Sequence, residues 1–112
     1  MIHVFLDDMR PCPQGFVLAR NVAECVLLLA ECEVDVLSLD YDLGGGPAET
    51  GLDVVRWLIA ERKFPRRLYL HSSSREARMR MYHMLYAAKP DSLLLQASPV
   101  PEELLLELAR AE

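Results

Sequence analysis

Long apolar runs and an excess of basic charge are both missing from this 112-residue sequence. No stretch approaches the length of a membrane span, and no charged start leads into a signal-like apolar segment, so we expect a cytoplasmic protein without membrane contact. Twelve Lys and Arg residues stand against seventeen Asp and Glu, which gives a net charge of −5. Extended binding to duplex nucleic acid requires many phosphates to be neutralised, so it is disfavoured, although a single terminal phosphate can still be held through a metal ion.

Cysteine is also scarce and is not arranged for metal binding. Cys12, Cys25 and Cys32 lack the spacing of metal ligands, and the last two are seven residues apart, on the same face of an expected helix. We interpret all three as buried thiols. Internal repeats, low-complexity tracts and linkers are absent too, and 52% hydrophobic with 26% charged residues is ordinary for a globular protein. We therefore expect one domain over residues 1–112, and the sequence leaves its oligomeric state open.

Short apolar segments alternate with amphipathic ones. We predict strands at residues 2–6, 16–20, 34–39, 67–71 and 92–96, and helices at residues 22–32, 51–62, 74–87 and 102–111. Asn21, Thr50 and Ser73 each precede an acidic residue by three positions, as in capping boxes, and Pro101 suits a first helical position. The alternation predicts an α/β fold of the flavodoxin-like type, a three-layer α/β/α sandwich around a mostly parallel five-stranded sheet. The segment after the first strand is too short and too rich in proline for a helix, so one crossover helix should be missing there.

Acidic residues follow two of these expected strands at the point where each ends. Asp7 and Asp8 come after the first strand, and Asp40 and Asp42 come after the third. The carboxyl ends of neighbouring parallel strands meet at one edge of a sheet, where open α/β sheets bind ligands. Carboxylates gathered there repel one another unless a cation lies between them, and oxygen ligands suit Mg²⁺ or Mn²⁺. We select Asp7, Asp8 and Asp40 as ligands of such an ion; the alternative is that these aspartates cap turns or nearby helix starts.

A histidine and serines follow the fourth expected strand. His71 would point into the same crevice, where its near-neutral pKa suits proton transfer or the holding of an anionic oxygen; the alternative is a structural histidine bonded to a backbone carbonyl. Ser72 and Ser73 lead into a helix N-terminus, which is itself an anion site, although serine is also the ordinary capping residue there. Arg10 and Arg78 could clamp phosphate oxygens, or they could be solvated surface groups.

A glycine-rich loop follows the second acidic segment. The three glycines at residues 44–46 could expose backbone N–H groups to a phosphate. They lack the spacing of a P-loop or of a dinucleotide-binding motif, so plain loop flexibility is the better interpretation.

Together these segments resemble the cyclic-phosphate-processing receiver (cREC) domains, a family related to two-component response-regulator receivers. The family pattern is a strand followed by Asp-Asp-x-Arg-x-Pro, then Ser-Leu-Asp-His-Asp-Leu-Gly at the end of another strand, then His-Ser-x-Asn with a downstream Arg and Met. The matching segments are residues 6–11, 37–44 and 71–74, with Arg78 and Met81 downstream. The motifs occur in the family's order and the resemblance covers nearly the whole chain, so it implies a receiver-like single domain.

The resemblance also implies an activity. The chain would be a metal-dependent phosphoesterase acting on a cyclic phosphate, such as a 2′,3′-cyclic RNA end or a cyclic nucleotide, with Mg²⁺ or Mn²⁺ as cofactor. Its partner would be a small phosphorylated ligand or an RNA terminus. The implied roles are catalysis by His71, Asp40 and Asp42, phosphate binding by Arg10, Ser72, Ser73 and Arg78, and metal binding by Asp7, Asp8 and Asp40.

Three departures from these patterns keep a second function open. Tyr41 stands where the family has histidine, and Ser74 stands where it has asparagine. A phenol donates hydrogen bonds but is a poor proton shuttle near neutrality, because its pKa is about 10. Ordinary receivers end their fifth strand in Lys-Pro, whereas residues 97–99 here read Ala-Ser-Pro, and Lys89 lies upstream of that strand. The alternative is therefore a non-catalytic or phosphoacceptor receiver-like signalling or binding module.

Overall fold

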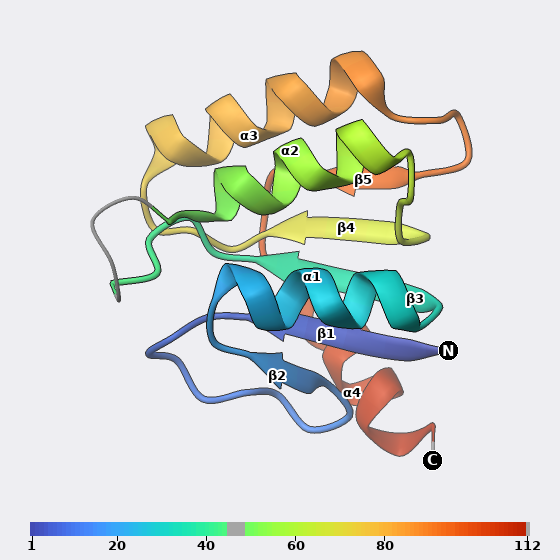
Figure 1. Cartoon of the computed structure of the whole chain (residues 1–112). Helices are drawn as coiled ribbons and strands as arrows, with labels where there is room; N and C mark the ends of the chain where they lie inside the picture. Colours follow the sequence, from blue (N-terminus) through green and yellow to red (C-terminus); the bar gives the residue numbers. More distant parts are fainter. Residues whose placement is uncertain (45–48, 112) are drawn as a thin grey trace.

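The computed structural model describes residues 1–44 and 49–111, and five short strands form its centre. The three central segments are largely apolar and mostly buried, as expected for strands covered on both faces. The strands lie in the order β2-β1-β3-β4-β5 and every neighbouring pair is parallel (Figure 1). The α/β class and the flavodoxin-like parallel sheet expected from the sequence are confirmed. The strands are β1 (Ile2–Leu6), β2 (Val17–Ala19), β3 (Val34–Leu39), β4 (Arg67–Leu70) and β5 (Leu94–Gln96).

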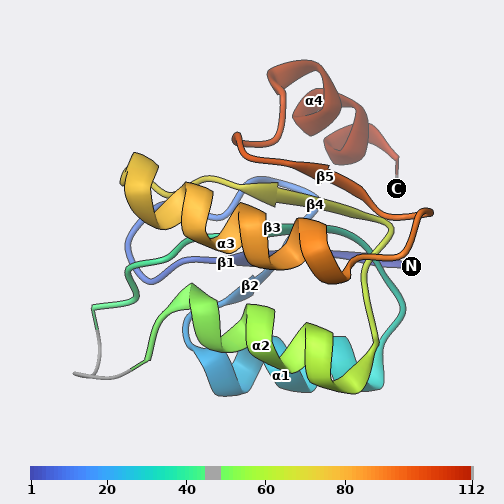
Figure 2. The ribbon, with the colours of Figure 1, turned by 90° about the horizontal axis from the view of Figure 1, so that it is seen from above.

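Four helices in the described part of the chain cover the two faces of this sheet. α1, α2 and α3 lie on one face and α4 lies on the other (Figure 2). The first three connect β2 to β3, β3 to β4 and β4 to β5, so each crosses the sheet in the same direction. Right-handed crossovers in one direction place all their helices on one face. The helices are α1 (Val22–Glu31), α2 (Gly51–Glu61), α3 (Arg75–Ala88) and α4 (Glu102–Arg110).

A loop replaces the helix that a receiver-like fold would have between β1 and β2. This connection runs in the opposite direction across the sheet and therefore belongs to the face of α4. Gly15 has a φ of +92°, and a Cβ added to it would lie 2.8 Å from the carbonyl oxygen of Leu108 in α4. The loop thus packs directly against α4. Position 15 needs glycine both for its backbone conformation and for this close approach. The missing crossover helix is as the sequence predicts.

Local capping explains where the helices begin, with two corrections to the sequence predictions. Thr50 and Asp53 form the expected capping box at the start of α2. At α3 the N-cap is Ser74 and not Ser73: the Ser74 hydroxyl accepts a hydrogen bond from the backbone N–H of Ala77, while the Ser74 N–H itself donates to the Ser72 hydroxyl. Pro101 occupies the N-cap position of α4, one residue before the first helical position, and caps no N–H with its side chain.

The core is divided by the sheet into two unequal parts. The larger part lies beneath α1, α2 and α3 and includes Leu6, Leu39 and Leu70, one from each central strand. The smaller lies beneath α4 and consists of Val36, Tyr69, Val100 and Leu108, with Phe16, Leu104 and Leu105 packed against it. Side chains alternate along a strand, so the residues directly before and after these leucines in sequence point to the other face of the sheet, the face of α4.

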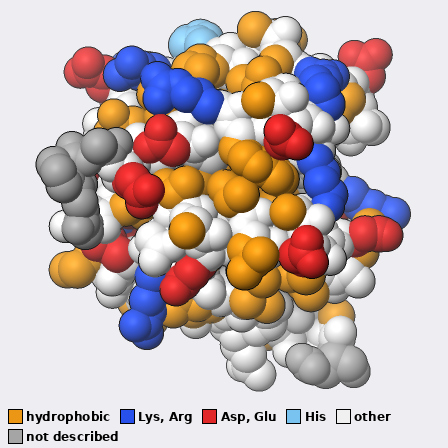
Figure 3. Space-filling view, viewed as in Figure 1, with side chains coloured by type: hydrophobic (Ala, Val, Ile, Leu, Met, Phe, Trp, Pro, Cys, Tyr) orange, Lys and Arg blue, Asp and Glu red, His pale blue; other side chains and the backbone are white. Residues whose placement is uncertain are grey.

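The outer surface of the three-helix layer is mixed in character. Apolar side chains are exposed near the middle of this face, and Asp, Glu, Lys and Arg side chains surround them (Figure 3). No helix within residues 1–44 and 49–111 has both the length and the apolarity to cross a membrane.

Candidate functional site

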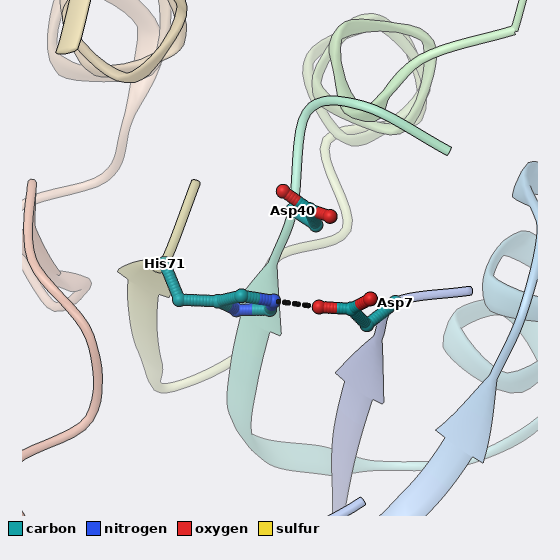
Figure 4. Close-up of side chains that lie close together, drawn as sticks. All are labelled: Asp7, Asp40 and His71. Atoms are coloured by element: carbon teal, nitrogen blue, oxygen red, sulfur yellow. Dashed lines mark hydrogen bonds and ion pairs between the residues drawn. The ribbon is translucent and has the colours of Figure 1, made fainter. Parts of the chain in front are cut away.

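Three buried polar side chains meet where the central strands end. Leu6, Leu39 and Leu70 are register partners across β1, β3 and β4, so the residues that follow them lie side by side. These residues are Asp7, Asp40 and His71, with exposed fractions of 1%, 5% and 8%. Each offers one ligand atom, and these atoms all lie within 4.8 Å of one another (Figure 4). In the described part of the chain the parallel topology therefore creates one carboxylate–imidazole cluster at the carboxyl edge of the sheet.

Asp7 accepts hydrogen bonds on both carboxylate oxygens. Its Oδ1 accepts from the backbone N–H groups of Met9 and Arg10, at 2.8 and 3.0 Å. Its Oδ2 accepts from the Arg10 guanidinium at 2.8 Å and from His71 Nε2 at 2.9 Å. Burial acts to raise the pKa of Asp7, but these hydrogen bonds outweigh it and lower the pKa to about 2. Asp7 is therefore a fixed carboxylate anion at neutral pH.

Asp40 shares its charge environment with Asp7. Burial, and then the neighbouring Asp7 carboxylate, raise the pKa of Asp40, while Arg10 and the backbone N–H of Tyr41 lower it in part. Arg10 Nη1 lies 2.8 Å from Asp7 Oδ2 and 3.2 Å from Asp40 Oδ2. One guanidinium thus bridges two buried carboxylates that would otherwise repel each other.

His71 is held on three sides by protein groups. Its Nδ1 lies 2.6 Å from Ser38 Oγ, its Nε2 lies 2.9 Å from Asp7 Oδ2, and its ring stacks on Phe5 with centroids 4.5 Å apart. Burial lowers the pKa of His71, against the raising effect of Asp7. A neutral ring has one N–H, and the Asp7 carboxylate can only accept, so Nε2 carries the proton and Nδ1 accepts from the Ser38 hydroxyl. The result is a buried hydrogen-bonded chain from Ser38 through His71 to Asp7.

Ser38 is the site residue that sequence reasoning missed. It is 1% exposed, lies next to the last residue of β3, and its hydroxyl bonds a side chain 33 residues away. The available signal was a polar residue inside an apolar strand, two positions before Asp40 and so on the same face of the sheet. Its partner could not be identified until β4 was known to lie beside β3.

Two acidic residues selected from the sequence lie apart from this cluster. Asp8 is half-buried, and its Oδ2 lies against Gly44, where an added Cβ would be only 2.5 Å away. Asp42 is exposed and its backbone forms an isolated bridge with Thr50. The structure brings Asp7 together with Asp40 and His71, and does not bring Asp8 into that group. Residues 45–46, the other two glycines of the suggested phosphate loop, lie outside the described residues.

The predicted phosphate-binding residues after β4 gather at the start of α3. Ser72 is buried, and its carbonyl accepts a 2.8 Å hydrogen bond from Arg78 Nη1. Arg78 Nε is buried and meets no hydrogen-bond acceptor within the described residues. Ser73 is exposed just before the N-cap residue. These groups lie at the positive end of a helix dipole, next in sequence to His71, so they are placed to bind an anion.

The carboxylate pair fits a divalent cation. Asp7 and Asp40 converge on one point that already attracts a positive group, the Arg10 guanidinium. Two carboxylate oxygens are hard ligands of the kind that Mg²⁺ and Mn²⁺ take, and an imidazole nitrogen suits Mn²⁺ better than Mg²⁺. A metal ion and Arg10 would compete for the same oxygens, and the Arg10 side chain is 42% exposed, so it has room to move away.

Comparison with known proteins agrees with the geometry. A sequence model of the family described as the cyclic-phosphate processing receiver domain matches residues 2–87. The matched region contains the ends of β1, β3 and β4, all of α2 and most of α3, and it stops before β5. No curated protein matches the chain.

Proposed function

The chain belongs to the cyclic-phosphate processing receiver domain family, and we propose that it opens a cyclic phosphate by metal-dependent hydrolysis. The substrate would be a 2′,3′-cyclic RNA end or a cyclic nucleotide. The observation that supports this most is the convergence of Asp7, Asp40 and His71, three buried polar groups with ligand atoms within 4.8 Å of one another. Two buried carboxylates need a nearby positive charge. The Arg10 guanidinium supplies it in this structure, and a divalent cation would take its place when bound.

The carboxylates of Asp7 and Asp40 would hold the ion. When bound, a divalent cation of this kind polarises phosphoryl oxygens and makes a coordinated water more acidic. Asp7 needs a fixed orientation for that role, and it receives four hydrogen bonds from its own surroundings. His71 donates one of them. Since both of its ring nitrogens are engaged by protein groups, we assign His71 the positioning of Asp7 ahead of direct proton transfer.

The phosphate would be bound by cationic and N–H groups around this cluster. Arg10 is half-exposed beside both carboxylates and can pair with a phosphoryl oxygen when it leaves them. Ser73 and the first turn of α3 present the positive end of the helix dipole, and Arg78 adds a guanidinium that donates to the Ser72 carbonyl. These groups bind and neutralise the substrate without covalent chemistry, which is how most phosphoryl transfer is catalysed.

The reaction requires one exchange of bonds at phosphorus. The water loses a proton as its oxygen bonds to phosphorus, one ring P–O bond breaks, and the departing oxygen takes up a proton to become a hydroxyl group. The product is a phosphate monoester. Asp42 follows the end of β3 two residues after Asp40, and its exposed side chain makes no hydrogen bond within the described residues. We therefore assign Asp42 the exchange of these protons with solvent.

The proposal is tested by hydrolysis of a 2′,3′-cyclic mononucleotide and a cyclic-ended oligonucleotide with MgCl2 or MnCl2, followed by ³¹P NMR. The wild-type protein should convert at least one of them to a monoester. Asp40→Asn should reduce the rate by at least about a hundredfold, because loss of an outer-shell partner alone costs about 10–100-fold and Asp40 would be a direct ligand. Asp91→Asn, a substitution in the turn before β5, is the matched control and should leave the rate unchanged. If folded wild-type protein leaves both substrates intact with either metal, the proposal is wrong.

A phosphoacceptor module is the second candidate, because Asp40 lies at the end of β3 beside Asp7, as an acceptor aspartate would. Residues 97–99 contain no lysine, and Lys89 bonds the carbonyl oxygens of Pro90 and Leu93, which disfavours this function. Acetyl phosphate distinguishes the two candidates. Mg²⁺-dependent phosphorylation of Asp40, together with no cleavage of a cyclic phosphate, would favour the module.

A further inference from the structure

A cavity of about 280 Å³ lies beside the proposed reaction site. Its walls come from the segment after β3 and from the first turns of α3, and it adjoins the site because Tyr41 directly follows Asp40. None of its lining residues belongs to the carboxylate–imidazole cluster. The lining residues are Tyr41, Ser74, Glu76, Ala77 and Arg80.

Tyr41 forms a fixed aromatic wall of this cavity. Its backbone N–H donates to Asp40 Oδ1 at 2.9 Å, and its carbonyl accepts from the N–H of Gly51 at 2.8 Å. The ring is half-buried and packs on the larger core cluster. The wall is therefore held in place by the same backbone that holds Asp40, as a pre-formed binding site requires.

Polar groups of both kinds surround this ring. Glu76 and Arg80 are one turn apart on α3 and exposed, yet no ion pair joins them to each other or to any residue that the structure describes. Arg80 offers N–H donors and Glu76 offers acceptors. The Ser74 hydroxyl accepts from the Ala77 N–H, so its own hydrogen is left to donate.

These features together select a class of ligand. The volume is near the lower end of small-molecule pockets, which begin at about 300 Å³, so it suits a single ring system and not an extended strand. A second phosphate would be repelled by Glu76, whereas a flat, uncharged ring with its own donors and acceptors can use all three polar groups. A nucleobase has this chemistry, and bases stack on aromatic side chains.

We propose that this cavity binds the base of a nucleoside cyclic phosphate, with the base against Tyr41 and its edge hydrogen-bonded to Arg80 or Glu76. The inference rests on the proposed function and narrows its substrate class to nucleotides. Tyr41 and Arg80 are then specificity-determining residues, because they contact the part of the substrate that does not react.

Two substrates with the same five-membered cyclic phosphate test this. Adenosine 2′,3′-cyclic phosphate carries a base and glycerol 1,2-cyclic phosphate does not. The wild-type protein should prefer the nucleotide in kcat/KM. Tyr41→Ala should raise KM for the nucleotide roughly fivefold to a hundredfold, the range for loss of one stacked base, and leave KM for the glycerol ester unchanged. Tyr41→Phe should keep the preference, and Tyr86→Ala, an exposed tyrosine at the other end of α3, should have no effect.

The outcomes separate the inference from the function on which it rests. If both substrates are cleaved with equal kcat/KM, or if Tyr41→Ala changes both equally, the nucleobase site is wrong and the phosphoesterase remains. If neither is cleaved, equilibrium dialysis with adenosine 3′-monophosphate and inorganic phosphate decides. If the wild-type protein binds adenosine 3′-monophosphate more tightly than inorganic phosphate, and Tyr41→Ala removes this difference, the base site is supported although the catalysis is not. If the wild-type protein and Tyr41→Ala bind the nucleotide equally, the base site is overturned together with the catalysis. Thermal melts of each variant verify folding.

Discussion

Replacement of Asp7 by asparagine should destabilise the metal-free protein, although it removes one of two like charges from the site. Oδ1 of Asp7 accepts two backbone N–H bonds, and Oδ2 accepts from Arg10 and His71. Asparagine has one oxygen and one NH2 group. If the oxygen keeps the backbone bonds, the NH2 group faces the Arg10 guanidinium, from which it cannot accept, and it can pair with His71 only if the ring changes tautomer. The loss of these bonds should outweigh the relief of repulsion with Asp40.

The size of the effect follows from the pKa of Asp7. Folding lowers this pKa from 3.8 to about 2, a difference of nearly two pH units, which corresponds to about 2 kcal/mol of stabilisation. Because the folded pKa is the lower one, this stabilisation is complete above about pH 4 and is lost as the pH falls towards 2. A domain of this length should then melt roughly 8 °C lower in the Asp7→Asn variant near neutral pH.

Urea unfolding in EDTA, followed by circular dichroism and by Trp57 fluorescence, measures the free energy of unfolding. At pH 7 the free energy of unfolding of the wild-type protein should exceed that of Asp7→Asn by about 2 kcal/mol. At pH 3 and below the difference should shrink, because Asp7 is then protonated in the unfolded chain and, near pH 2, also in the folded one. Asp91→Asn makes the same chemical change at an exposed turn and should stay within about 0.5 kcal/mol of wild type. EDTA is needed because a bound cation would add its own stabilisation.

Two results would refute this reasoning. If Asp7→Asn equals or exceeds the wild type at pH 7, repulsion between the carboxylates dominates and the four hydrogen bonds contribute little. If the difference does not narrow towards low pH, the lowered pKa of Asp7 is not its source.

Two further substitutions test how the site is built. Gly51→Ala should destabilise the protein by about 1–3 kcal/mol, because the added Cβ would lie 2.0 Å from the carbonyl oxygen of Asp40, whereas an ordinary Gly→Ala change in a helix stabilises. The control is Ala60→Gly on the exposed side of the same helix, which removes a methyl group and should cost about 1 kcal/mol. If denaturant unfolding shows that Gly51→Ala is stabilised, this packing is contradicted. Ser38→Ala should lower the free energy of unfolding by about 1–3 kcal/mol and leave His71 Nδ1 without a donor. ¹⁵N NMR of the imidazole should then show a shifted Nδ1 resonance, because this nitrogen has lost its donor, while Nε2 keeps the proton that it donates to Asp7. An unchanged Nδ1 resonance would argue against the Ser38–His71–Asp7 chain.

Local features of the structure were predictable because few residues decide them. The α2 capping box needs only Thr50 and Asp53, and β3 was predicted at its observed bounds from its own residues. The fold class and the family were predictable as well, since the alternation of elements and the order of motifs are properties of the sequence. The α3 cap was off by one residue because a third serine competes: the Ser72 hydroxyl takes the N–H of Ser74, and that fixes Ser74 as the cap.

The acidic strand ends show how far sequence reasoning reaches for the site. Parallel strands have to bring their carboxyl ends to one edge, so the approach of Asp7 to Asp40 was foreseeable. The structure does not bring Asp8 into this cluster, and its choice as a third metal ligand stays a prediction. The cluster takes His71 in its place, because the chain turns after β1 as the Asp7 carboxylate binds the N–H groups of Met9 and Arg10, while Asp8 lies against Gly44.

The amino-acid order alone determined which chemical groups stand at each strand end, and how the chain alternates between strand and helix. Only the tertiary structure decided which of those groups touch. His71 bonds Asp7 across 64 residues and Ser38 across 33, and Arg10 joins Asp40 across 30. Such contacts depend on which strands are neighbours, on the face to which each side chain points, and on the space left between them. Local conformational preference carries none of this information, because it acts over a few residues at a time.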